Sequence, residues 1–290
     1  MGNQLPELEK LFDDWTAKHE KLLSQKEPYF IDHEPPFGKF IRDGVVNMDE
    51  WKKQKVRICF VLSEASGYDD LEKFPNGADV AADWNEKGCF SKMMLMLATW
   101  TKAIFDSTNS MPIPYAKKAL LKQKHDLIRS IAVVNVKKSD GKLATVGKNV
   151  ANFATEDAEE IRKELEIIKA NIIVVSVDLK KIVGDRPENE TENSRRKFVF
   201  YNDEIERANH RSYKWGKNKL IINLWSPAQN YKPAASKVVN YYAVREIVRE
   251  GIKSFQAPEK KLKVAKSKNV KSKDTNLKAK VASENDAAAE

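Results

Sequence analysis

Four short apolar runs in the sequence are bounded by polar or turn-forming residues, as expected of buried strands. They cover residues 56–62, 131–136, 171–178 and 219–225. The segments between them repeat apolar residues every three or four positions, which is the spacing of an amphipathic helix. We expect helices at residues 6–24, 87–106, 116–128, 155–170 and 233–255. Strands that alternate with helices predict a parallel sheet with right-handed crossovers.

This alternation predicts an α/β fold with three layers, α/β/α, around a central four-stranded parallel sheet. A single domain over residues 1–256, beginning with the helix at 6–24, contains all of these elements. Nine lysines lie between Pro258 and Lys280 among few apolar side chains, so we expect residues 257–290 to form a disordered Lys-rich tail. Other expectations are an ordered loop at 27–50, a mobile loop at 139–152 and an edge strand at 198–201.

The net charge of the chain is +9, and a basic excess attracts polyanions such as DNA. Residues 258–290 carry +4 of this charge, so the body alone does not establish nucleic-acid binding. The tail is expected to be a non-specific polyanion anchor, or else only a solubilising segment. The chain has two cysteines, Cys59 and Cys89, which is typical of a reduced protein. The sequence shows no secretory signal and no apolar run of about 20 residues. We therefore expect a reduced cytoplasmic monomer outside the membrane.

Polar residues lie at the carboxyl end of each of the four apolar runs, within its last residues or directly after it. They are the segment SEASGYDD at 63–70, residues 135–138, residues 176–178, and the segment WSPAQN at 225–230. Ligands of open parallel sheets bind outside the carboxyl ends of the strands. We therefore expect the functional site where these four segments converge.

The order of these elements over roughly residues 35–250 resembles the uracil-DNA glycosylase superfamily. The family's first motif corresponds to Phe60–Tyr68 (FVLSEASGY), its last to Ser226–Asn230 (SPAQN), and Asn135 stands where the family often places a base-recognising asparagine. The chain departs from the family at Ser226, where a histidine usually stabilises the charge left on the departing base. The resemblance implies a DNA glycosylase without a cofactor. It would act on a damaged or modified base flipped out of DNA, in base excision or in defence against modified foreign DNA.

Cleaving a base from deoxyribose needs a carboxylate or oriented water on the sugar side and hydrogen bonds to the leaving base. Glu64 is the first candidate for the carboxylate, and Asp69 and Asp70 are rivals that could equally cap a helix. The alternative for Glu64 is an ion pair with a surface lysine. Asn135 can read a Watson–Crick edge, or can simply tie neighbouring segments together. Ser226 can donate to the base or to a phosphate, or only mark a turn.

The remaining residues of the expected base pocket and DNA contact lie in the same strand-end segments. They are Ser66, Gly67, Tyr68, Asp69, Lys137, Pro227, Ala228, Gln229 and Asn230. Lys137, Lys138 and Lys232 flank the strand ends and are candidates for binding phosphates, with solvated lysines as the alternative. The four histidines and two cysteines show no zinc-ligand spacing, so we expect no metal.

Three functions stay open on the sequence. The first is a DNA glycosylase, and the second is a non-catalytic nucleic-acid-binding protein on the same fold, which the missing histidine at Ser226 favours. The third is an unrelated α/β enzyme that acts on a nucleotide or a sugar. Release of a base from DNA would indicate the first function, and DNA binding without base release the second. Absence of DNA binding would indicate the third.

Overall fold

The computed structural model describes residues 5–24, 40–66, 79–107, 117–141, 147–177, 211–215, 219–224 and 235–256. The chain divides into two units, Met1–Gln256 and Ala257–Glu290, and the described residues all belong to the first unit. The expected Lys-rich tail and the expected strand at 198–201 lie outside the described residues, as do residues 27–39 of the expected ordered loop.

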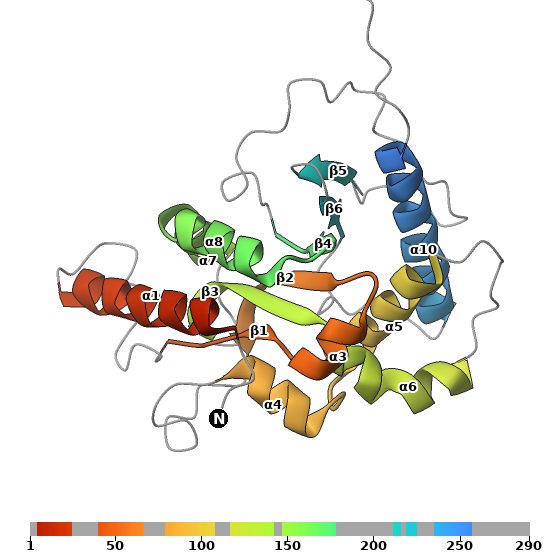
Figure 1. Ribbon diagram of the computed structural model, residues 1–290, viewed down its shortest axis with the longest axis horizontal. Coiled ribbons are helices and arrows are strands. Elements are labelled where there is room, and N and C mark those ends of the chain that lie inside the picture. Colours follow the sequence, from red (N-terminus) through yellow and green to blue (C-terminus); the bar gives the residue numbers. More distant parts are fainter. Residues whose placement is uncertain are drawn as a thin grey trace, which may run out of the picture. The chain divides into compact units, whose positions relative to one another are not determined.

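Six strands form one mixed sheet in the order β1-β3-β2-β4-β6-β5 (Figure 1). They are β1 (Gly44–Val45), β2 (Ile58–Ser66), β3 (Ala132–Gly141), β4 (Ile172–Val175), β5 (Arg211–Trp215) and β6 (Lys219–Asn223). β3, β2, β4 and β6 pair in parallel, whereas β1 and β5 pair antiparallel at the two edges. The chain is therefore an α/β protein, as expected, and its sheet is mixed.

Eight helices are described around this sheet. They are α1 (Pro6–Ser24), α3 (Met48–Lys53), α4 (Val80–Lys87), α5 (Lys92–Ser107), α6 (Lys117–Arg129), α7 (Gly147–Glu156), α8 (Ala158–Ile168) and α10 (Ala235–Gln256). Side-chain caps start three of them: Asn47 accepts a hydrogen bond from the backbone N of Glu50, Asp79 accepts one from Ala82, and Ser91 accepts one from Met94. Such caps satisfy backbone donors that the first helical turn leaves free.

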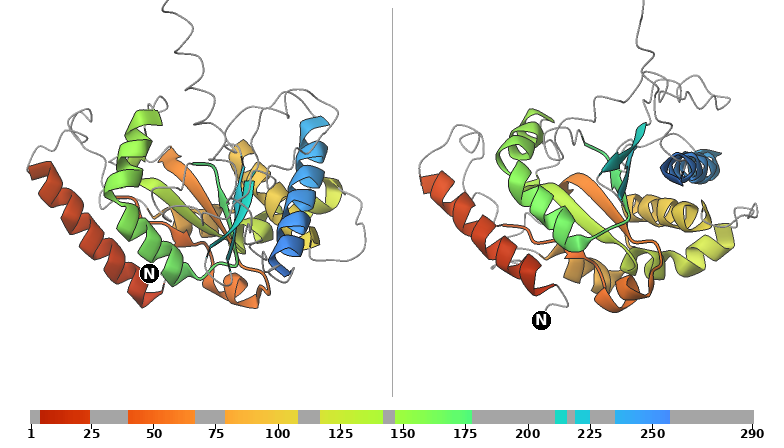
Figure 2. Two further views of the ribbon diagram at one scale, coloured as in Figure 1. Left: turned by 90° about the horizontal axis from the view of Figure 1, so that it is seen from above. Right: turned by 45° about the horizontal axis from the view of Figure 1, so that its top comes forward.

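Successive residues of β2 pack into two separate hydrophobic clusters, because side chains alternate between the faces of a sheet. Phe60 packs with residues of α5, α6 and α10, whereas Cys59 and Val61 pack with residues of α1, α7 and α8. Figure 2 shows α5 and α10 on one side of the strands and α1 and α8 on the other. Burial of Cys59 raises the pKa of its thiol well above the usual range.

The helix expected at 87–106 is confirmed over most of its length as α5, but it begins at Lys92, because the preceding helix α4 ends at Lys87 and Gly88 follows it. Gly88 has φ +64°, a conformation that favours glycine. A Cβ at this position would also lie 2.1 Å from Nδ1 of His125 on α6, too close for any side chain. The break therefore depends on a contact with a distant helix as well as on local backbone conformation.

The segment 139–170 also differs from expectation. β3 continues to Gly141 and α7 begins at Gly147, so much of the expected mobile loop at 139–152 is regular structure. The expected helix at 155–170 is interrupted at Asp157, which separates α7 from α8. The buried carboxylate of Asp157 lies 2.9 Å from Nε2 of His19, which holds α1 against this junction.

Within the described ranges, none of the helices has the length and apolar character that a membrane crossing requires.

Candidate functional site

Glu64 lies near the carboxyl end of β2, next to Lys137 of the neighbouring strand β3. The parallel register pairs Leu62 with Asn135 and Glu64 with Lys137, so Glu64 and Asn135 are diagonal neighbours on one face of the sheet. Nζ of Lys137 is 3.7 Å from Oε2 of Glu64. Lys137 is buried, whereas 19% of the Glu64 side chain is exposed. The structure thus brings together three of the residues that the sequence places at the site.

Asn135 is held by the carboxylate of Asp43, which precedes the edge strand β1. Oδ2 of Asp43 accepts a hydrogen bond from the backbone N of Asn135 at 2.6 Å and another from its Nδ2 at 2.9 Å. Both residues are buried. Asn135 therefore links β3 to the segment before β1, which is the structural role considered for it above. Its role in base reading stays a prediction.

Lys138 forms a fully buried network with Asp43 and Glu164. Its Nζ donates to Oδ1 of Asp43 and lies 2.8 Å from Oε2 of Glu164 on α8. Burial raises the pKa of the Glu164 carboxyl well above its usual range, and the negative charge of Asp43 raises it further. Burial alone would lower the pKa of Lys138, but the two facing carboxyl groups outweigh this and raise it. Lys138 is thus held inside the fold by two carboxyl groups, which offset part of the cost of desolvating its ammonium.

Aromatic side chains of α1 cover this network. Nζ of Lys138 lies 5.3 Å from the ring centre of Phe12 and 5.2 Å from that of Trp15, distances at which a cation is attracted to the ring face. Trp15 in turn donates from Nε1 to Nε2 of His19 at 3.1 Å. α1 therefore closes one side of the network and keeps water from Lys138.

Besides the carboxyl oxygens of Glu164, one of which pairs with Lys138, two acceptor oxygens of the site have no hydrogen-bond partner among the described residues. They are Oδ1 of Asn135 and Oε2 of Glu64, and both atoms are buried. The 3.7 Å between Glu64 and Lys137 is an ion-pair distance that is too long for a hydrogen bond. A buried acceptor without a donor costs about 1–3 kcal/mol. Two such oxygens on adjacent strands indicate a site for a donor that the described chain does not supply.

Most of the other predicted site residues lie outside the described residues. They are Gly67, Tyr68, Asp69, Asp70, Ser226, Pro227, Ala228, Gln229, Asn230 and Lys232. Ser66 is described by its backbone alone, which ends β2 in register with Gly141. The meeting of Ser226 with Glu64 and Asn135 therefore stays a prediction.

Three details of the predicted site are wrong. Asn135 does not end its strand, because β3 continues to Gly141. Lys138 is fully buried between Asp43 and Glu164, so it is not a surface lysine that binds phosphates. Lys137 is also buried, at 2% exposure, and points its ammonium at Glu64 rather than at the protein surface. Each lysine is retained inside the fold because a carboxyl group faces it.

Asp43 and Glu164 are the two members of the cluster that the sequence analysis missed. Glu164 had a readable signal: it lies three residues after Ile161 and four before Ile168, on the apolar face of α8, where a carboxyl group is unusual. Asp43 had none, since its partner Asn135 is 92 positions further along the chain.

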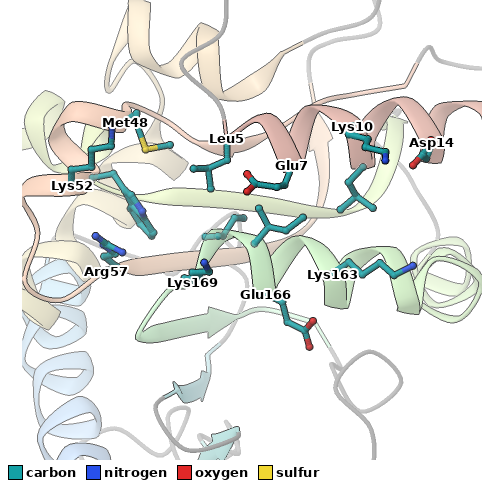
Figure 3. Close-up of a pocket in the computed structure, with 14 residues that line it drawn as sticks. Leu5, Glu7, Lys10, Asp14, Met48, Lys52, Arg57, Lys163, Glu166 and Lys169 are labelled. Carbon is teal, nitrogen blue, oxygen red and sulfur yellow. The ribbon is translucent and has the colours of Figure 1, made fainter.

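The structure contains a pocket of about 630 Å³ elsewhere, between α1, α3 and α8 (Figure 3). Arg57, at its wall, directly precedes β2, so the pocket lies towards the amino ends of the strands, away from Glu64. Apolar side chains and eight charged ones, five basic and three acidic, line it. Because charges of both signs are mixed around the pocket, it does not favour ligands of one charge. The charged residues are Glu7, Lys10, Asp14, Lys52, Arg57, Lys163, Glu166 and Lys169.

Among the described residues, no group of three or more His, Cys, Asp and Glu side chains is arranged to hold a metal ion. Comparison with known proteins found no family model that matches the chain and no match among curated proteins. The contacts around Glu64 and Asn135 are therefore the observations from which a function has to be argued.

Proposed function

We propose that this protein is a DNA glycosylase, which hydrolyses the bond between deoxyribose and a damaged or modified base flipped out of DNA. One observation carries the proposal: Glu64 and Asn135 are diagonal neighbours on β2 and β3, and each has a buried oxygen without a hydrogen-bond partner among the described residues. The resemblance to the uracil-DNA glycosylase superfamily, which uses these two positions, supports it. So does the parallel pairing of β3, β2, β4 and β6, the centre of the three-layer α/β/α arrangement that the proposal assumes.

In the proposed reaction Glu64 acts on the sugar side of the scissile bond. Its carboxylate accepts a proton from water while the water oxygen bonds to C1′. The C1′–N bond breaks, its electron pair leaves with the base, and the base takes up a proton. Because the transition state resembles an oxocarbenium ion, the negative charge of Glu64 also stabilises the positive sugar. The partial exposure of this side chain makes it accessible to water.

Lys137 positions the carboxylate of Glu64 in this proposal. Its buried ammonium lies 3.7 Å from Oε2 without donating a hydrogen bond to it, so this oxygen can accept one from the reacting water. Asn135 contacts the base instead, through the oxygen that Asp43 leaves unused. In this proposal Glu64 on β2 acts on the sugar and Asn135 on β3 binds the base. The parallel register of the two strands fixes the spacing between these residues.

DNA is the partner that the proposal requires, and the Lys-rich segment 257–290 would increase the affinity for DNA without reading its sequence. Its contribution should depend on ionic strength, because each phosphate contact releases counterions. The biological setting that we propose is base excision or defence against modified foreign DNA.

The test is a screen of oligonucleotides that each carry one modified base, such as uracil, hypoxanthine or a modified cytosine. The full chain is incubated with each of them, and alkali then cleaves the strand at any abasic site. Glu64→Gln should lower the rate of base release at least about 100-fold, whereas the matched control Glu166→Gln on α8 should leave it unchanged. DNA binding that weakens with salt while no oligonucleotide loses a base would instead identify a non-catalytic binding protein.

A further inference from the structure

The amide of Asn135 can face Asp43 in only one orientation. The carboxylate of Asp43 receives three N–H donors: the backbone N and Nδ2 of Asn135, and Nζ of Lys138. If the amide turned over, Oδ1 would face a carboxylate oxygen, and two acceptors would be in contact without a hydrogen between them. The chemistry of the partner therefore fixes the positions of Nδ2 and Oδ1.

The network around Asp43 keeps this orientation in place. Asp43 is fully buried, and its other oxygen is held by Lys138, which is itself paired with Glu164 and covered by Phe12 and Trp15. If Asp43 rotated away from the amide of Asn135, Lys138 would lose one of its two carboxyl partners. The ion pair with Lys138 therefore keeps Asp43 in place. Oδ1 of Asn135 stays buried and without a hydrogen-bond partner among the described residues.

We infer that Asp43 is a positioning residue that sets base specificity: it restricts Asn135 to presenting an acceptor, so the base that binds must direct an N–H group at Oδ1. Such bases carry an imino N–H, as uracil and hypoxanthine do, or an exocyclic amine, as cytosine and adenine do. A base that directs a carbonyl oxygen or an unprotonated ring nitrogen at this position is rejected, since it would leave two acceptors facing each other. This inference rests on the proposed function and adds to it the class of base that the site accepts.

The first experiment examines the amide itself in the full-length protein, without any substrate. The side-chain NH₂ signal of Asn135 is assigned in ¹⁵N-resolved NMR spectra by its loss in Asn135→Asp, and its exchange with water is measured. We expect exchange at least 100-fold slower than that of exposed asparagine side chains. Exchange at the rate of exposed side chains would show that Asp43 does not hold the amide, and would overturn the inference.

The second experiment uses whichever base the oligonucleotide screen identifies. Two oligonucleotides differ only in that base, one with the free N–H and one with that nitrogen methylated, and the ratio of their release rates is measured. In Asp43→Ala no acceptor remains at the position of Oδ2, so the amide of Asn135 is no longer restricted to one orientation. We expect the ratio to fall at least 10-fold in this variant and to stay unchanged in Asp49→Ala, a matched control at an exposed position of α3.

The outcomes of the two experiments separate this inference from the proposed function. If no oligonucleotide loses a base, the glycosylase proposal fails, and the exchange rate still decides the orientation of the amide. If bases are released but Asp43→Ala leaves the ratio unchanged, the discrimination is steric. In that case the proposed function stands and the role of Asp43 in specificity is refuted.

Discussion

The cluster around Asp43 and the pocket between α1, α3 and α8 lie towards opposite ends of the parallel strands and differ in almost every physical respect. Asp43, Asn135, Lys138 and Glu164 of the cluster are buried, and its charged groups face one another. Among the residues that the structure describes, Oδ1 of Asn135 has no hydrogen-bond partner. The pocket is a space of about 630 Å³ with an apolar floor and charges of both signs around it. The pocket is the space left between three packed helices. The cluster instead contains buried polar groups, which cost free energy to bury, and it is therefore where we expect the chemistry to take place.

The largest effect should follow from removing the central cation of the cluster. Lys138→Met keeps the length of the side chain but leaves Asp43 buried without its counter-ion, so we expect a loss of about 3–5 kcal/mol in the free energy of unfolding. Denaturant titration measures this change. Lys163→Met at the pocket is the control, because Lys163 is exposed and its ion pair with Glu159 is solvated, so its effect on stability should be small. If the two variants lost the same free energy of unfolding, the proposed difference between the cluster and the pocket would be contradicted.

A smaller effect, dependent on pH, should come from Glu164. Burial raises its pKa in the folded protein above the value of 4.5 that it has in an unfolded chain, so the folded state keeps a proton that the unfolded state releases. Its contribution to stability is complete below pH 4.5 and is lost as the pH rises through the folded pKa. Glu164→Gln should abolish this loss, by about 1.4 kcal/mol for each unit by which the pKa is raised.

The measurement for Glu164 is the free energy of unfolding at several pH values between 4 and 9. The exposed Glu166→Gln on the same helix is the control, and its profile should follow that of the unaltered protein. A Glu164→Gln profile that retains the full decline towards high pH would show that Glu164 is ionised in the folded state.

The smallest effect is expected at the rim of the pocket. Lys169 ends α8 with φ 55° and ψ 42°, a left-handed conformation that costs an L-residue energy and suits glycine. Lys169→Gly should therefore raise the free energy of unfolding by about 0.5–1 kcal/mol. The same change at Lys163, inside α8, should lower it by about 1 kcal/mol. A loss of stability in Lys169→Gly would mean that the lysine side chain contributes contacts at the pocket that outweigh the strain.

The sequence predicted the elements whose signals are local. The expected bounds of the helix at 6–24 match α1, and the apolar runs at 56–62 and 171–178 contain most of β2 and all of β4. In these segments the periodicity of buried residues dictates the structure. The helix expected at 87–106 is confirmed as α5 from Lys92 onwards, but its beginning was misplaced, because the break at Gly88 depends on His125, a contact that periodicity cannot show.

The candidate site was predicted in part, for the same reason. Glu64, Asn135 and Lys137 could be placed together because the parallel arrangement aligns neighbouring strands. The burial of Lys137 and Lys138 was not predicted, because charged residues next to an apolar run usually turn to solvent. The carboxyl groups that retain Lys138, Asp43 and Glu164, come from distant segments, which only the tertiary structure brings together.

The most direct test of the central claim compares one variant of the cluster with one variant of the pocket in the same base-release assay. Glu64→Gln should lower the rate at least about 100-fold, while Lys52→Gln, at the wall of the pocket, should leave it unchanged, with both rates measured at a temperature where each variant is folded. A full rate in Glu64→Gln together with a lost rate in Lys52→Gln would contradict the claim and move the active site to the pocket.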